Sequence, residues 1–306
     1  MFSHIKTGVA VVLRNKKMVA LFYFSNLLIG FLFILPFRAA LSQFLGSSRM
    51  AENLHHFIDL TFLAEFFKTN GAVMGQLGLN LSVLAPLYFL LMLFLSGGAF
   101  ALFVRGGGWP EQFWANSAAF FWRFVRLFLW SLPVLSLVFV LPWLGSLVQK
   151  LIHGDDPYQW VGYYWARVKI ILAGLATLYY HLVFDYARII AVSGDERNMR
   201  KTITAALRFV HSRLFSTAGI SLVYFSAGIA GMAIYYFTTH AFDGNSTLVV
   251  TALFLLSQAY IIFRTLIKLG LYAAESSFYS AALVPAASEE LPFAGEDETG
   301  LAEATS

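Results

Sequence analysis

The sequence predicts an all-α integral membrane protein with six transmembrane helices. The first observation behind this is composition: 12% of the residues are charged and 58% are hydrophobic, whereas soluble domains contain about 25% charged residues. A protein with so few charged residues would not stay soluble in water, and we therefore expect its surface to be surrounded by lipid. The second observation is six apolar runs, since a helix needs about 20 apolar residues to cross a bilayer. The runs cover residues 18–36, 79–104, 124–147, 170–186, 214–240 and 247–263.

The distribution of lysine and arginine is the third observation, and it orients the spans. With the N-terminus in the cytoplasm, fifteen of the 21 basic residues fall on the cytoplasmic side and six on the opposite side. Cytoplasmic segments of multi-pass proteins carry the excess of positive charge, so both termini are predicted to be cytoplasmic. The first span is not a cleavable signal, because it is longer than the apolar region of a signal peptide and lacks a small-residue cleavage site.

The three connections on the outer side predict different structures. The first, residues 37–78, contains ENLHHFIDLTFLAEFFK, whose apolar residues recur at helical spacing, so we expect a helix on the outer membrane interface. The second, HGDDPYQWVGYYW, carries the Trp and Tyr residues that are typical of the headgroup region. The third, FDGNS, is predicted to be a tight turn. The apolar residues of the first connection are Leu54, Phe57, Ile58, Phe62 and Phe66.

Three stretches on the cytoplasmic side resemble one another and predict an internal repeat. They are KTGVAVVLRNKKMVALFYF, SAAFFWRFVRLFLWSL and TAALRFVHSRLFSTAGI, and each joins a small-residue amphipathic segment to basic residues and a span. Pro110 and Glu111 favour a helix start in the second copy, and Ser193 with Glu196 has the spacing of a capping box before the third. We expect a threefold repeat of a cytoplasmic amphipathic helix followed by a transmembrane hairpin. The alternative is that unrelated juxtamembrane helices look alike.

The segment DYARIIAVSGDERNMRKTITAALRFV closes a span with an aspartate and an arginine, turns, and enters a basic amphipathic helix. In this layout the chain resembles six-span bacterial inner-membrane proteins of no established activity. The group includes the YciC-like proteins and the membrane domains attached to some glycerophosphodiester phosphodiesterases. The resemblance implies a multi-pass protein of the bacterial inner (plasma) membrane. The 306 residues contain no segment with the features of a phosphodiesterase domain, so that activity is not implied.

Candidate functional residues lie in the run HLVFDYARII of the fourth span. His181, Asp185 and Arg188 are spaced by four and three residues, which places them on one helical face. A matching polar face in the sixth span contains Arg264 and Lys268, together with Ser257 and Glu275. We expect Asp185 to pair with Arg264 or Lys268. These polar residues have two interpretations. They form either a structural latch near the membrane boundary or a pathway for a substrate or for protons.

Signatures of an enzyme are missing from the sequence. There is no cysteine, which excludes disulfides and thiolate chemistry. His55 and His56 lack the spacing of a helical zinc motif, and no nucleotide-binding motif is present. No serine stands in a nucleophile elbow with a plausible catalytic set. We therefore predict no enzymatic activity, no cofactor and no metal.

Two functions are compatible with these features. The first is transport or lipid handling across or within the bilayer, supported by the six spans and the interfacial helices. The alternative is a membrane scaffold or subunit that binds a protein partner through its basic cytoplasmic helices and acidic tail. Membrane lipids are expected partners under either hypothesis, and nucleic acid is not expected. Residues 1–283 are predicted to form one membrane domain. Residues 284–306, with six acidic and no basic residues, are predicted to form a disordered cytoplasmic tail.

Overall fold

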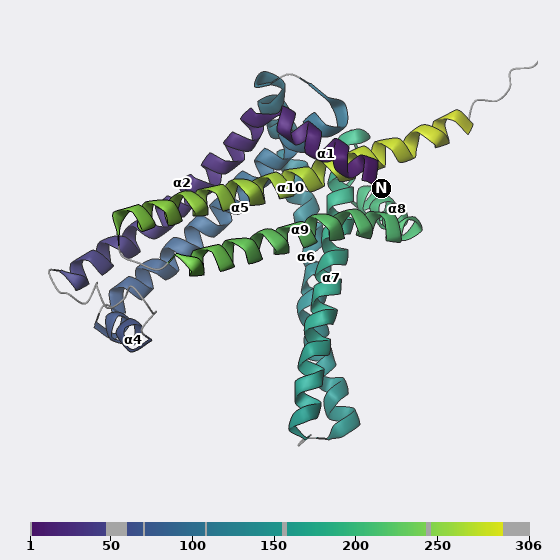
Figure 1. The fold of residues 1–306 in the computed structure, drawn as a ribbon. Coiled ribbons are helices and arrows are strands. Elements are labelled where there is room, and N and C mark those ends of the chain that lie inside the picture. The colour runs from purple at the N-terminus through teal and green to yellow at the C-terminus, as the bar shows by residue number, and fades with distance from the viewer. Residues whose placement is uncertain are drawn as a thin grey trace, which may run out of the picture.

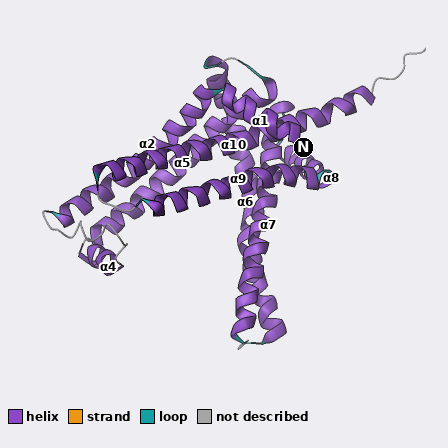
Figure 2. Cartoon of the chain, viewed as in Figure 1, coloured by secondary structure: helices purple, strands orange, loops and turns teal. Residues whose placement is uncertain are grey.

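The computed structural model describes residues 2–46, 60–69, 71–107, 109–154, 158–242 and 246–289, and in these residues every regular element is a helix (Figures 1 and 2). The elements are α1 (Phe2–Arg14), α2 (Lys16–Leu45), α4 (Leu60–Thr69), α5 (Gly71–Arg105), α6 (Glu111–His153), α7 (Gln159–Ser193), α8 (Met199–Ser212), α9 (Leu214–Ala241) and α10 (Thr247–Glu289).

Six of these helices, namely α2, α5, α6, α7, α9 and α10, are long and apolar enough to cross a membrane. The prediction of an all-α fold with six helices able to span a membrane is thereby confirmed for the described residues, and these helices are consistent with a multi-pass integral membrane protein. The helices are longer than the predicted spans, because their polar extensions continue without a break. In α6, for example, the amphipathic segment that precedes the third span belongs to the same helix of 43 residues.

The spans form two groups that diverge from a common base (Figure 1). One group, which we call the four-helix group, consists of α2, α5, α9 and α10. The other is the hairpin of α6 and α7, which leaves the base in a different direction. Contacts within the hairpin reach its far end, where Lys169 Nζ donates to Gln149 Oε1 at 3.1 Å. Contacts between α5 and α6 lie closer to the base, as in the ring pair Phe89–Phe128 with centroids 4.3 Å apart.

The main hydrophobic core lies at the base, which also carries α1, α8 and the connections α5–α6 and α7–α8. We call this the basic end, because most of the arginines and lysines predicted to be cytoplasmic lie there. In α10, burial is concentrated in residues 265–276, whereas residues 247–263 are exposed or half-buried. The outer halves of the spans therefore present apolar side chains to lipid and to the space between the two groups.

Close helix packing at the basic end depends on glycine. A Cβ on Gly98 of α5 would lie 2.8 Å from the ring of Phe113 in α6. A Cβ on Gly8 of α1 would lie 2.8 Å from the carbonyl oxygen of Gly270 in α10. Both distances are shorter than van der Waals contact, so these helices approach as closely as they do because the side chain is absent.

The amphipathic helices α1 and α8 are separated from the following spans by breaks at Asn15 and Arg213. The second predicted copy has no such break, since α6 is continuous, and the threefold repeat stays a prediction. The predicted capping box is wrong: Ser193 is the last residue of α7. The N-cap of α8 is Asn198, whose side chain accepts a hydrogen bond from the Arg200 N–H at 3.2 Å.

At the far end of the four-helix group, α4 contains the second half of the helix that was predicted on the outer interface. Phe62 and Phe66 are buried against Phe37 and Phe44 of α2. This part of the predicted helix therefore packs on α2. The first half of the prediction, including His55 and His56, lies outside the described residues.

Candidate functional site

Charged and polar side chains gather where α7, α9 and α10 meet at the basic end. Asp185 of α7 is buried, and its Oδ1 accepts a hydrogen bond from Arg188 Nη1 at 2.9 Å, forming an ion pair within one helical turn. The predicted pairing of Asp185 with Arg264 or Lys268 is wrong. The carboxylate of Asp185 pairs with the guanidinium of Arg188 instead, because a spacing of three residues on one helix already brings the two groups together.

Arg264 and Lys268 of α10 lie one helical turn apart, and both are exposed. Neither forms an ion pair with any carboxylate among the described residues. Lys268 lies within electrostatic reach of Asp185 and Arg188 on α7, and Arg264 lies within reach of Tyr88 on α5. The electrostatic neighbours of the two cations therefore include residues of other spans as well as each other.

Glu275, two turns further along α10, is completely buried. Its Oε1 accepts a hydrogen bond from Ser221 of α9 at 2.9 Å, while its Oε2 has no hydrogen-bond partner. The nearby Tyr186 hydroxyl is also buried without a partner. The sequence placed Glu275 on the polar face of the sixth span but gave no reason to count it among the site residues, because burial by α9 is a tertiary effect.

His181 does not join this cluster. Its side chain is exposed, and its ring makes an edge contact with the neighbouring Tyr180. The three residues of HLVFDYARII thus separate: Asp185 and Arg188 turn toward α10, and His181 turns outward. The difference arises because most residues of α7 are buried from Leu182 onward, whereas Val161 is the one buried residue described in the part of α7 before it.

Polar contacts continue from the cluster into the four-helix group. Tyr88 of α5 donates to Asn26 Oδ1 of α2 at 2.7 Å, and Tyr23 of α2 donates to Gln258 Oε1 of α10 at 2.8 Å. Asn26 and Tyr88 also border a cleft of about 290 Å³ between α2 and α5. The rest of the cleft is apolar, with Ile29, Gly30, Phe33, Leu81, Leu84 and Ala85 as its walls.

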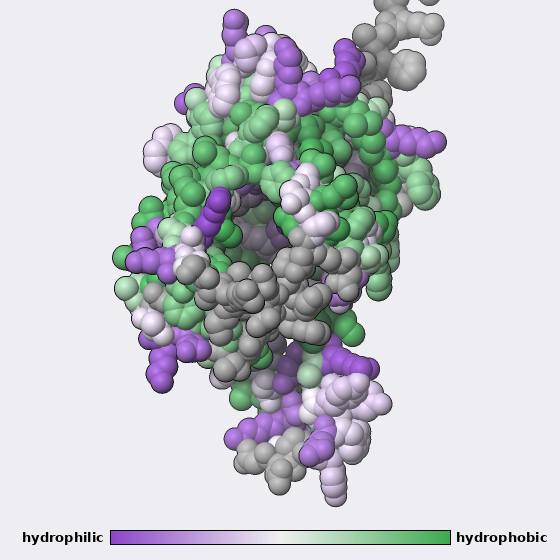
Figure 3. All heavy atoms as spheres, turned by 60° about the vertical axis from the view of Figure 1, so that its left-hand side comes forward, coloured by the Kyte–Doolittle hydropathy of each residue, from purple (hydrophilic) through white to green (hydrophobic). Residues whose placement is uncertain are grey.

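The surface of the four-helix group is hollowed when it is viewed from its outer ends. Figure 3 shows this hollow between walls of mainly hydrophobic residues, with hydrophilic residues at its depth. Apolar walls and a polar floor are the combination that an amphipathic ligand requires.

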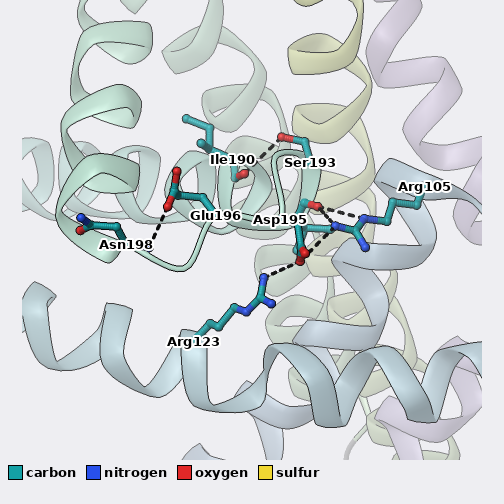
Figure 4. A network of polar contacts seen from close by, with 8 residues as sticks. Arg105, Arg123, Ile190, Ser193, Asp195, Glu196 and Asn198 are labelled. Atoms are coloured by element: carbon teal, nitrogen blue, oxygen red, sulfur yellow. Dashed lines mark hydrogen bonds and ion pairs between the residues drawn. The ribbon is translucent and has the colours of Figure 1, made fainter.

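A second polar network holds the connection between α7 and α8 (Figure 4). Asp195 accepts from Arg123 of α6 at 2.6 Å and lies 3.6 Å from Arg105 of α5. Arg105 also donates from Nε to the carbonyl oxygen of Val192 at 2.9 Å. The hydrogen bond from Arg123, reinforced by its charge, lowers the pKa of Asp195 below its ordinary value. Asp195 has a positive φ of 49°, a conformation that aspartate tolerates better than most residues.

This network ties three helices together at the basic end, and the sequence analysis missed it. The only local signal was the aspartate of SGDE, which was interpreted as part of a cap. Its two arginine partners are 90 and 72 residues away along the chain, so no short-range pattern could identify them.

A third polar region is a pocket of about 440 Å³ beside the same connection. It is bordered by α6 on one side and by the start of α8 on the other. Within the described residues, no group of three histidine or acidic side chains is placed to hold a metal ion.

Comparisons with protein-family models, with curated proteins and with solved structures find no match to this chain. The resemblance to six-span bacterial inner-membrane proteins therefore stays a prediction.

Proposed function

We propose that this protein binds anionic lipids between its spans and moves them across the bilayer. The observation that carries the proposal is the pair Arg264 and Lys268. These cations lie in a membrane-spanning helix, are exposed, and have no carboxylate partner in an ion pair among the described residues. Charge in a membrane-spanning helix is costly, by about 2.5–3.5 kcal/mol at the helix centre and by less near a membrane face, so cations without an ion pair favour a counter-ion supplied by a ligand.

The neighbours of the two cations, and not their depth in the membrane, argue against simple snorkelling to the membrane surface. Arg264 is 17 residues beyond Thr247, or about 26 Å along α10 at 1.5 Å per residue, which is close to one face of a bilayer core of about 30 Å. A lysine at that depth can reach lipid headgroups cheaply. However, the electrostatic neighbours of Lys268 and Arg264 lie on α7 and α5, so the two side chains face other spans.

The charge balance selects an anionic ligand. Arg188, Arg264 and Lys268 supply three positive charges, whereas Asp185, which is engaged by Arg188, and the buried Glu275 supply at most two negative charges. A negatively charged headgroup at Arg264 and Lys268 would offset the remainder. The apolar outer halves of the spans and the cleft beside Gly30 would accommodate acyl chains.

The scaffold hypothesis has less support from the geometry. Helices α1 and α8, which were its expected docking elements, bury one face against the bundle, as Val12 and Val210 show. Their exposed faces are available to a partner, but no feature of those faces indicates one. The predicted tail begins at residue 284, but α10 continues to Glu289, and the residues after 289 lie outside the described part of the chain.

The test is reconstitution of the purified chain in liposomes that contain a fluorescent anionic lipid, phosphatidylglycerol, or a fluorescent zwitterionic lipid, phosphatidylcholine. Bleaching of the outer leaflet with dithionite measures how fast the inner-leaflet fluorophore becomes accessible. We expect the protein to accelerate movement of phosphatidylglycerol more than that of phosphatidylcholine. Rates equal to those of protein-free liposomes for both lipids would reject the proposal. Leakage of an entrapped soluble dye serves as the control for membrane integrity.

A further inference from the structure

The pocket of about 440 Å³ at the basic end is built from two elements that are far apart in the sequence. Arg126 and Trp130 come from the first membrane turns of α6, and Arg197 and Arg200 come from the start of α8. Glu196 and Met199 also line the pocket. These residues are different from Arg264 and Lys268, so the pocket is additional to the site of the proposed function.

Three guanidinium groups border the pocket, and none of them forms an ion pair with a described carboxylate. Arg126 makes a long hydrogen bond of 3.4 Å from Nε to the carbonyl oxygen of Trp122, which leaves its terminal nitrogens free. The carboxylate of Glu196 is engaged by a backbone group, since its Oε1 accepts from the Asn198 N–H at 2.9 Å. The pocket therefore carries a formal charge of about +2, with most of its donors uncommitted.

The walls of the pocket are held in place by the surrounding structure. The guanidinium of Arg200 lies over the ring of Trp130, with its carbon 4.6 Å from the ring centroid, which orients its planar group. Met199 is buried and anchors the first turn of α8. The connection that carries Glu196 and Arg197 is fixed by the adjoining Asp195 network (Figure 4).

The pocket borders the lipid-facing side of α6. Trp130 is 45% exposed, and the neighbouring Leu129 is 55% exposed. Tryptophan beside arginine at the end of a span is typical of the headgroup region of a membrane. A ligand in the pocket can therefore keep an acyl chain in lipid while its polar group meets the arginines.

From this cavity, its charge and its position we propose that the pocket binds a phosphate group, with a phosphate monoester headgroup of a membrane lipid as the best match. Guanidinium groups bind phosphate oxygens through paired N–H donors. A phosphate monoester carries a charge of about −1.5 to −2 near neutral pH, which matches the charge of the pocket. Free inorganic phosphate has the same chemistry but no acyl chain to use the apolar border.

The experiment measures binding of short-chain phosphatidic acid, short-chain phosphatidylcholine and inorganic phosphate to the purified full chain in detergent by isothermal titration calorimetry. The test variant is the triple substitution Arg126→Gln, Arg197→Gln and Arg200→Gln. Its matched control is Lys6→Gln, Arg14→Gln and Lys17→Gln, which removes three exposed charges from the same end. A thermal melting curve of each variant verifies that it is folded.

We expect phosphatidic acid to bind the wild-type chain and the control triple at least tenfold more tightly than the test triple. Phosphatidylcholine should bind the wild-type chain much more weakly than phosphatidic acid. If inorganic phosphate binds as tightly as phosphatidic acid, the phosphate site is supported and free phosphate is its source. If only phosphatidic acid binds, the source is the lipid headgroup. Equal binding by the wild-type chain and the test triple, or an equal loss in the control triple, would overturn the proposal.

This result is independent of the lipid-movement assay. If the pocket arginines bind phosphate but the protein moves no lipid, the proposed function fails and the pocket stands. If lipid movement depends on Arg264 and Lys268 while the test triple binds phosphatidic acid as tightly as the wild type, the phosphate-binding proposal is rejected and the proposed function stands. Should the test triple not fold, the single variants Arg126→Gln and Arg197→Gln are measured instead, with Arg14→Gln as their control and a threefold weakening in each expected.

Discussion

The carboxylate of Asp185 and the guanidinium of Arg188 pair at 2.9 Å across one turn of α7. This short-range pair leaves Arg264 and Lys268 on the facing helix without a carboxylate in an ion pair among the described residues. The local pair is structural, and the two remaining cations are available to a ligand. The distinction separates variants that destabilise the fold from variants that remove function.

Substitution of Asp185 by Asn should destabilise the protein, because it leaves Arg188 half-buried without its counter-charge. Removing one partner of a buried ion pair costs about 3 kcal/mol or more, and denaturant unfolding in mixed micelles would measure the loss. The double variant Asp185→Leu with Arg188→Leu should be more stable than Asp185→Asn, since no charge is then left unpaired. If the double variant is the less stable of the two, the pair does not have the role assigned to it.

The ion pair of Asp195 with Arg123 should make the connection between α7 and α8 sensitive to acid. The pKa of Asp195 is lowered in the folded protein, so its stabilising contribution is complete above the unfolded pKa of about 3.9 and is lost as the pH falls through the lower, folded pKa. At neutral pH, amide hydrogen exchange in residues 193–198 should be faster in Asp195→Asn than in the wild type. Corrected for the intrinsic pH dependence of exchange, this difference should disappear at strongly acidic pH. Equal protection at neutral pH would contradict the prediction.

Substitution of Gly8 by Ala should weaken the packing of α1 against α10. The new methyl group would lie 2.8 Å from the Gly270 carbonyl oxygen and 2.9 Å from Ala274 Cβ, and such overpacking costs about 1–3 kcal/mol. We expect a lower thermal unfolding midpoint in detergent. Gly75→Ala is the matched control, because a Cβ at that helical glycine meets nothing within 4 Å. A midpoint that falls equally in both variants would show that the close approach is not the cause.

A bulky side chain in the cleft between α2 and α5 should slow lipid movement without unfolding the protein. Gly30 borders this cleft, and a Cβ there meets nothing within 4 Å, so Gly30→Phe can fill the space at little steric cost. In the dithionite assay we expect at least a threefold lower rate. Gly174→Phe, at an equally open glycine of α7, should keep the wild-type rate. An unchanged rate in Gly30→Phe would remove the cleft from the lipid path.

The six apolar helices and the helical character of residues 60–69 could be predicted from the sequence, because each depends on apolar runs or on periodicity along a short stretch. The partner of Asp185 was predicted wrongly, since Arg188, Arg264 and Lys268 all satisfied the pattern and the prediction favoured another span over the residue three positions away. The burial of Glu275 by Ser221 of α9 is a consequence of tertiary packing.

The divergence of the α6–α7 hairpin from the four-helix group also had no signal in the sequence. Hydropathy gives the number and length of spans but carries no information on which spans lie side by side. Likewise, the sequence does not identify the partner of Gly98, and the structure shows that Phe113 of α6 is its neighbour. The pocket between Arg126 and Arg200 escaped prediction for the same reason.

The most direct test of the central claim is the rate at which phosphatidylglycerol crosses liposomes that contain the double variant Arg264→Gln and Lys268→Gln. Arg167→Gln with Lys17→Gln is the matched control, because it removes one arginine and one lysine that are both exposed and lie outside the cluster. We predict that the control moves the lipid at the wild-type rate and that the double variant, folded and incorporated to the same level, moves it at least tenfold more slowly. A double variant as fast as the wild type would contradict the claim that these two cations hold the headgroup.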